Sequence, residues 1–290
     1  MHSAPAARTV HVGVGLPTGD PAALLTWARR AEAGPFRTIG LLDRVVYDNP
    51  EPLVALAVLA GATSRVRVQT EVLLAPLRDT ALLAKQAATL DRMTGGRLVL
   101  GLGVGGRADD HRATGTDLHT RGRRLDRQLP LLRRLWAGEP YGDDVGPVGP
   151  APARPGGPEI LFGGFRPPAL RRAARWGDGF LAAAPPSWAQ DLFATVRRHW
   201  REYGRPGEPR IVAQVNVALG PDDVIDDARA RMHAYYAFTG MADRMTAGLL
   251  TTPAAIRSAL TAFGDLGADE VVCYCHGLDP DQVDRLADLL

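Results

Sequence analysis

Short apolar runs rich in β-branched residues alternate along the chain with longer runs in which apolar residues recur every three or four positions. The short runs predict strands, and the longer runs predict amphipathic helices. Eight strand–helix units share the 290 residues, at about 36 residues each, which is the usual unit size in a (β/α)8 barrel. We therefore predict an α/β fold with one TIM-barrel domain over residues 1–290, and keep an open doubly wound sheet as the alternative.

The expected elements follow one another in strict alternation. The strands are expected at Val10–Leu16, Thr38–Leu42, Val66–Leu74, Arg97–Gly103, Glu159–Phe162, Gly179–Ala182, Ile211–Leu219 and Glu270–Tyr274. The helices are expected at Pro21–Ala33, Pro52–Thr63, Thr80–Arg92, Arg121–Trp136, Pro168–Trp176, Trp188–Tyr203, Asp222–Phe238, Pro253–Phe263 and Pro280–Leu289.

Three insertions interrupt this regular pattern. Val104–Thr120, after the fourth strand, is polar and Gly-rich, and in a barrel it lies on the catalytic face. Gly138–Pro158, between the fourth helix and the fifth strand, is rich in Gly and Pro, and we expect an irregular excursion there. The third insertion follows the seventh strand, where two helical runs occur in place of one.

The third predicted strand alternates strictly between polar and apolar positions. Arg67, Gln69 and Glu71 share one face, and the other face is apolar apart from Thr70. Since successive side chains of a strand point to opposite sides, one face is expected to pack on helices and the other to point into the barrel.

Composition and charge exclude several classes of protein. The chain is 46% hydrophobic and 23% charged with a net charge of +2, which is typical of a globular protein and argues against a dedicated nucleic-acid binder. No run reaches the roughly 18 apolar residues of a membrane span, and residues 1–8 lack the features of a signal peptide. Cys273 and Cys275, the only cysteines, are expected to be buried thiols. We expect a cytoplasmic protein without a metal site.

Common catalytic motifs are missing from the sequence. None of the four serines lies in G-x-S-x-G, and neither a Walker A sequence nor H-E-x-x-H occurs. Gly101–Gly106 fits G-x-G-x-x-G, but a polar segment follows instead of the helix that a dinucleotide site requires. We expect these glycines to let a flat ring lie close to the backbone instead.

Two groups of residues at strand ends are candidates for binding or chemistry. Gly163, Gly164, Phe165 and Arg166 join a strand to a helix, either as an anion site or as an ordinary turn. Four acids, Asp43, Glu71, Asp109 and Asp110, follow or end neighbouring strands and are expected to converge on one mouth of the barrel. Buried carboxyl groups there can act as general acids or bases, whereas we expect Asp110 to be a solvated loop residue.

Three segments together resemble the luciferase-like flavin-dependent oxidoreductases. They are Pro76–Gly105, Arg121–Asp126 leading to Leu135-Trp136, and Ile160–Gly164 leading to Arg175–Gly179. The resemblance covers almost the whole chain in conserved order of motifs. It implies a (β/α)8 barrel, commonly a homodimer, that binds the deazaflavin F420 or reduced FMN at its C-terminal mouth. It also implies a non-proline cis peptide, here Glu71–Val72, at a bulge that supports the cofactor ring.

The resemblance also assigns positions around the cofactor. Val72, Leu73 and Leu74 are expected to back the ring, Gly103, Val104, Gly105 and Asp109 to flank it, and Gly163, Gly164, Phe165 and Arg166 to hold the phosphate tail.

The sequence departs from many F420-using relatives at three positions. Asp43 is followed by Arg44 instead of His, and Arg stays charged and cannot donate a proton near neutral pH. Gly106 stands where some relatives have Glu, whereas Glu71 stands where small residues are usual. We expect Asp43 or Glu71 to transfer the proton.

We therefore expect an F420-dependent reductase or dehydrogenase that acts on a small organic substrate, whose pocket is built from Gly105–Leu118, Tyr235–Leu250 and the loop after the last strand. The alternatives are an FMNH₂-dependent monooxygenase that activates O₂ and a non-catalytic flavin-binding homologue.

Overall fold

The structure is a computed structural model that describes residues 10–290. Residues 1–9 lie outside the described residues. The expectation that residues 1–8 are not a signal peptide concerns this segment. Parallel strands form a closed barrel in the order β3-β2-β1-β11-β10-β9-β8-β5, and β3 also pairs with β5. This closure confirms the predicted (β/α)8 barrel and excludes the open sheet.

The barrel strands lie close to the predicted ranges. They are β1 (His11–Gly15), β2 (Thr38–Leu41), β3 (Arg67–Thr70) with β4 (Leu73–Leu74), β5 (Leu98–Gly103), β8 (Glu159–Gly163), β9 (Gly179–Ala182), β10 (Arg210–Val217) and β11 (Glu270–Cys275).

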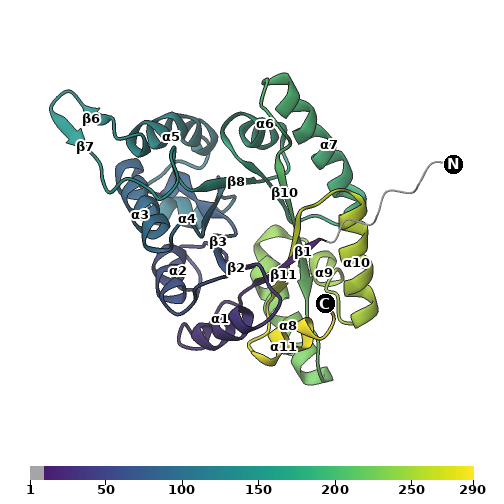
Figure 1. Ribbon diagram of the computed structural model, residues 1–290. Helices are drawn as coiled ribbons and strands as arrows, with labels where there is room; N and C mark the ends of the chain where they lie inside the picture. The colour runs from purple at the N-terminus through teal and green to yellow at the C-terminus, as the bar shows by residue number, and fades with distance from the viewer. Residues whose placement is uncertain (1–9) are drawn as a thin grey trace.

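Helices surround the barrel on the outside (Figure 1). They are α1 (Leu24–Ala33), α2 (Pro52–Gly61), α3 (Thr80–Met93), α4 (Ala108–Ala113), α5 (Arg121–Trp136), α6 (Pro167–Trp176), α7 (Pro186–Glu202), α8 (Asp222–Tyr236), α9 (Ala242–Thr246), α10 (Pro253–Asp265) and α11 (Asp281–Ala287), with 3-10 turns η1 (Ala75–Leu77) and η2 (Ala237–Thr239). None of the helices in the described part of the chain is long and apolar enough to cross a membrane.

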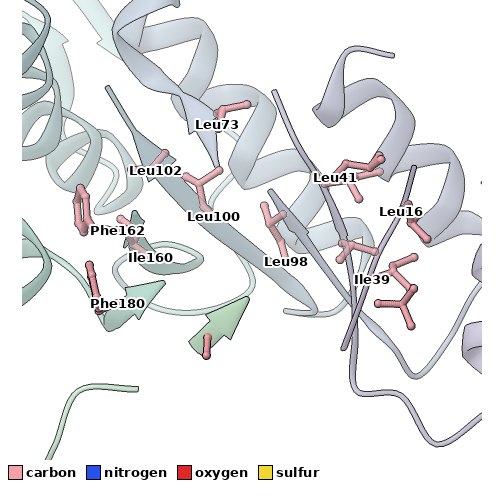
Figure 2. Close-up of a cluster of buried hydrophobic side chains, with 14 of the residues drawn as sticks. Leu16, Ile39, Leu41, Leu73, Leu98, Leu100, Leu102, Ile160, Phe162 and Phe180 are labelled. Carbon is pink, nitrogen blue, oxygen red and sulfur yellow. The ribbon is translucent and has the colours of Figure 1, made fainter. Parts of the chain in front are cut away.

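The outward faces of the strands carry most of the hydrophobic core. Alternate residues of each strand point toward the helices. Ile39 and Leu41 of β2 and Leu98, Leu100 and Leu102 of β5 therefore belong to the same buried cluster (Figure 2). Cys273 and Cys275 belong to this outer core and are buried free thiols, which confirms the expectation from sequence.

The inside of the barrel is filled by a separate apolar layer. Its buried members are Val99, Leu161, Leu181, Val212 and Val272, and the partly buried Val72 packs against them. Below this layer, at the N-terminal ends of the strands, the interior is ionic. Arg210 bridges Glu159 and Glu270 at 2.6 and 2.5 Å, and Arg67 pairs with Glu159 at 2.5 Å.

The insertions are more regular than predicted. Gly138–Pro158 was expected to be irregular, but it contains an antiparallel hairpin of β6 (Pro140–Gly142) and β7 (Val145–Pro147), which projects from one side of the barrel (Figure 1). The segment after β5 includes the short helix α4, and the insertion after β10 comprises α8, η2 and α9.

The ion pairs at the N-terminal end of the barrel should contribute strongly to stability. Replacing Arg210 by Met leaves the carboxylate of Glu270, whose side chain is 1% exposed, without its cation. Removing one partner of a buried ion pair costs about 3–5 kcal/mol. We therefore expect Arg210→Met to lower the free energy of unfolding by about 3 kcal/mol in urea titrations.

The matched control is Arg198→Met, which removes an exposed guanidinium 3.6 Å from Glu202. Exposed pairs contribute about 0–1 kcal/mol. Equal losses of unfolding free energy in the two variants would contradict a stabilising role of these ion pairs.

Candidate active site

The third predicted strand breaks into β3 and β4 at Glu71 and Val72, and the peptide bond between them is cis. This bond was predicted from the family resemblance and is confirmed. The alternation put Glu71 and Val72 on opposite faces of one strand; Val72 nevertheless packs inside the barrel, because the break adds a residue to the strand. Glu71 also lies on the inner side, where its carboxyl group lies against Gly40 of β2.

Glycines on two neighbouring strands leave room for Val72. A Cβ at Gly103 of β5 would lie 2.4 Å from Val72 Cγ2, and one at Gly163 of β8 would lie 2.9 Å from Val72 Cγ1. Both distances are shorter than any tolerated carbon–carbon contact. Gly103, which the sequence pattern associated with a flat ring, and Gly163, which it associated with an anion site or a turn, therefore both leave room for a side chain of the barrel itself.

Glu71 is a buried carboxyl group with one free oxygen. Its Oε1 accepts a hydrogen bond from Gln69 Nε2 at 2.7 Å, and its Oε2 is buried without a hydrogen-bond partner in residues 10–290. Burial raises the pKa of Glu71 to about 8; the negative charge of Glu270 adds to this shift and the Gln69 hydrogen bond opposes it. Glu71 is thus largely protonated at neutral pH, and it can give up or take a proton in this range.

Asp43, two residues after the end of β2, forms hydrogen bonds with residues that follow the strand break. Its Oδ2 accepts hydrogen bonds from the Leu74 N–H at 2.7 Å and from Arg78 Nη1 at 2.6 Å, and Arg78 Nη2 lies 3.1 Å from Oδ1. Burial raises the pKa of Asp43, and the Arg78 guanidinium opposes that shift. These bonds hold the backbone of Leu73 and Leu74 in place, and both Asp43 oxygens are engaged.

Asp110 is not the solvated loop acid that the sequence suggested. It is 1% exposed, its Oδ2 lies 3.0 Å from Arg44 Nε, and its Oδ1 accepts hydrogen bonds from the N–H groups of Val45 and Val46.

The guanidinium of Arg44 also lies over the rings of three aromatic residues, Tyr47, Tyr235 and Phe238, at 5.0, 5.7 and 5.4 Å. Arg44 and Asp110 therefore join the loops after β2 and β5 beneath the end of α8.

The segment after β5 brings Asp109 to the mouth in a different state from Glu71. Asp109 pairs with Arg107, which lowers the pKa of Asp109, so it is a permanent anion near neutral pH. Val104 packs against the outer core, and Gly105 has a φ of +71°, with Leu74 and His111 beside it. Asp109 is thus an accepting group but not a proton donor.

The junction between β8 and α6 offers free backbone donors. The N–H groups of Gly164, Phe165 and Arg166 donate to no other group among residues 10–290, and the first two residues of the helix, Pro167 and Pro168, have no N–H. Gly164 has a φ of +140°, which favours glycine. Three donors beside an exposed Arg166 offer a place for an anion, which is one of the two roles expected for this junction.

A cavity of about 580 Å³ lies between β9, β10 and the insertion after β10, and Trp188, which lines it, stacks on Phe165 of this junction. Tyr236, Met241 and Leu250 line it, as expected for the segment Tyr235–Leu250, whereas Gly105–Leu118 contributes no residue to its lining. Sequence reasoning missed Gln214 and Asn216, which also line it. Alternation along β10 with the inward-facing Val212 could have identified both.

A larger cavity of about 780 Å³ lies at the opposite, N-terminal end of the barrel, beside Arg210 and Glu270. We place the active site at the mouth, because catalytic groups of such barrels lie at the C-terminal ends of the strands. No cluster of His, Cys, Asp and Glu that could hold a metal ion occurs within residues 10–290.

Comparisons of sequence agree with this geometry. A family model described as luciferase-like monooxygenase matches residues 3–283. An uncharacterised protein of Mycobacterium tuberculosis is 36% identical over 163 residues, which cover 53% of this chain and 56% of that protein. An F420-dependent glucose-6-phosphate dehydrogenase of Kineococcus radiotolerans is 30% identical over 194 residues, which cover 62% of this chain and 56% of that protein. The chain thus spans about half the length of the curated relatives that it matches.

Among solved structures, an F420-dependent secondary alcohol dehydrogenase in complex with an F420–acetone adduct is similar, with a TM-score of 0.81. The two sequences are 18% identical, and the match covers 97% of this chain and 98% of that chain. At this identity the likeness shows the fold.

The raised pKa of Glu71 should change how the free energy of unfolding depends on pH. A carboxyl group whose pKa is higher in the folded than in the unfolded protein favours folding while it stays protonated, and this advantage is lost as the pH rises toward about 8. We expect the free energy of unfolding of the wild type, relative to Glu71→Gln, to fall by about 2 kcal/mol between about pH 6 and about pH 8.

Urea unfolding of both proteins across this range measures the difference. Glu208→Gln, which changes an exposed carboxylate that forms no salt bridge within residues 10–290, is the control and should run parallel to the wild type. Parallel curves for the wild type and Glu71→Gln would exclude the raised pKa.

Proposed function

Because the chain belongs to the luciferase-like monooxygenase family, we propose that it is an F420-dependent oxidoreductase that moves a hydride between the reduced deazaflavin and a small organic substrate. The family is one of flavin- or F420-dependent oxidoreductases, which favours an enzyme over a non-catalytic homologue. The observation that carries the proposal is Glu71, a buried carboxyl group that exchanges its proton near neutral pH beside the strand break. Hydride transfer to a carbonyl, or from an alcohol, needs such a proton carrier.

The residues at the mouth fit the cofactor. Val72 is partly buried at the top of the inner layer, and Leu73 and Leu74 continue the surface on which a ring can lie. Gly103, Val104, Gly105 and Asp109 form the neighbouring edge. The free N–H groups of Gly164, Phe165 and Arg166, together with the Arg166 side chain, suit the phosphate of the cofactor tail.

When bound, the reduced deazaflavin supplies the hydride. The chain supplies the rest of the chemistry: Asp43 and Arg78 fix the backbone on which the ring lies, and Glu71 holds or accepts the proton at Oε2. We assign proton transfer to Glu71 and a positioning role to Asp43, because both oxygens of Asp43 are already engaged by Arg78 and Leu74.

An FMNH₂-dependent monooxygenase is the second candidate. The description of the matching family model favours it, and the largely apolar lining of the cavity beside the mouth suits oxygen activation, which needs a site poor in water. The proton carrier at Glu71 and the similarity to an F420-dependent dehydrogenase favour the first candidate.

Cofactor titration separates the two candidates. We expect the purified protein to bind F420 with micromolar affinity, followed by the fluorescence of the cofactor. Arg166→Ala should weaken this binding about tenfold through loss of a charged hydrogen-bond donor, whereas Arg171→Ala, an exposed position on the same helix, should leave it unchanged. Micromolar binding of FMN together with no binding of F420 would overturn the preference for F420.

Turnover tests the role of Glu71. For an alcohol that the wild type oxidises with F420, we expect Glu71→Gln to lower kcat about a hundredfold, since the amide cannot carry the proton. The Kd for F420 should stay within about twofold, because this change is isosteric. Unchanged turnover in the variant would show that another group moves the proton.

A further inference from the structure

The cavity at the mouth is lined by partly buried amides from the barrel strand β10 and by an exposed arginine from α9, so its inner and outer ends differ in chemistry. Its middle is lined by apolar side chains, among them Trp188, Met241, Met245 and Leu250. At about 580 Å³ it falls within the range of pockets that enclose small organic molecules. The nature of its two ends therefore indicates which molecules it can hold.

The inner end, on β10, is polar and uncharged. Gln214 has no side-chain hydrogen-bond partner in the described part of the chain, so its amide is free to bind a ligand. Asn216 Oδ1 lies 3.1 Å from Nε2 of the buried His276. Burial lowers the pKa of His276 to about 4, so the imidazole is neutral at neutral pH. The two amides that line this end, one of them in contact with a neutral imidazole, suit a hydroxyl or carbonyl oxygen and disfavour a charge.

The outer end carries one positive charge, on an exposed side chain. Arg244 on α9 is the only charged residue among those that line the cavity. It forms no salt bridge within residues 10–290, and its neighbour Asp243 is already 3.1 Å from His233. An arginine without a carboxylate partner, at the end of an apolar cavity, is complementary to an anion with an apolar body.

We propose that the substrate is an apolar carboxylate with a hydroxyl or carbonyl group at its opposite end. Arg244 binds the carboxylate, the apolar walls enclose the body, and Gln214 and Asn216 hold the oxygen that undergoes the chemistry. The assignment of this oxygen as the reacting group rests on the proposed function. The selection for an anionic, apolar ligand depends only on the cavity.

Binding to the cofactor-free full-length chain tests this selection. Decanoate, decanol and decylamine have the same chain length and differ in charge, and tryptophan fluorescence reports their binding because Trp188 lines the cavity. Loss of the response in Trp188→Phe identifies the signal. We expect decanoate to bind about tenfold more tightly than decanol, and decylamine to bind more weakly than both.

Two arginine variants make the test specific to Arg244. Arg244→Met, which keeps an apolar side chain of similar length, should abolish the preference for decanoate over decanol. Arg198→Met, on the exposed side of α7, should keep it. A preference that survives in Arg244→Met, equal or tighter binding of decylamine, or no binding of any of the three would overturn the proposal.

The outcome is independent of the cofactor assay. Selective binding of decanoate by a protein that does not bind F420 would support the substrate class and reject the proposed cofactor. Binding of F420 without selection for decanoate would have the opposite meaning.

Discussion

The position of Val72 inside the barrel is the constraint on which the rest of the mouth depends. A Cβ at Gly103 or at Gly163 would collide with its side chain. Val72 can therefore occupy this position only because the two neighbouring strands carry glycine beside it. The break that turns Val72 inward also leaves Glu71 on the inner side, where the carboxyl group loses water. The bonds from Asp43 to Leu74 and Arg78 then fix the chain beyond the break. A single packing requirement thus produces both an apolar platform and a carboxyl group with a raised pKa.

The two ends of the barrel use charge in different ways. At the N-terminal end, Arg67 and Arg210 neutralise Glu159 and Glu270, and Glu270 Oε1 is left without a hydrogen-bond partner within residues 10–290. At the mouth, the charged pairs of Asp43 and Asp110 hold loops, while Glu71 Oε2, Gln214 and Arg244 remain without partners within residues 10–290. Paired charges contribute stability, and free polar groups are available to a ligand. The mouth carries an acid and a cation among its free groups, and barrel enzymes hold their catalytic groups at this end, which together support placing the chemistry at the mouth.

Much of the fold could be predicted from sequence, because period-two and period-3.6 patterns report burial directly. The ranges of β9 and α5 agree with the prediction at both ends. Alternation put Glu71 and Val72 on opposite faces because periodicity assumes an uninterrupted strand, whereas both lie on the inner side. Asp110 was taken as solvated because its partner, Arg44, is 66 residues away in the chain. The hairpin β6–β7 was missed, since its residues are exposed and carry no burial pattern.

Direct titration of Glu71 tests the central claim most sharply. Carbon-13 NMR of side-chain carboxyl groups, with Glu71 assigned by the loss of its signal in Glu71→Gln, gives the midpoint without any cofactor or substrate. Our account predicts a midpoint near 8. A midpoint near the ordinary value of about 4.3 would show that Glu71 is an ionised carboxylate at neutral pH, and would contradict its role as the proton carrier.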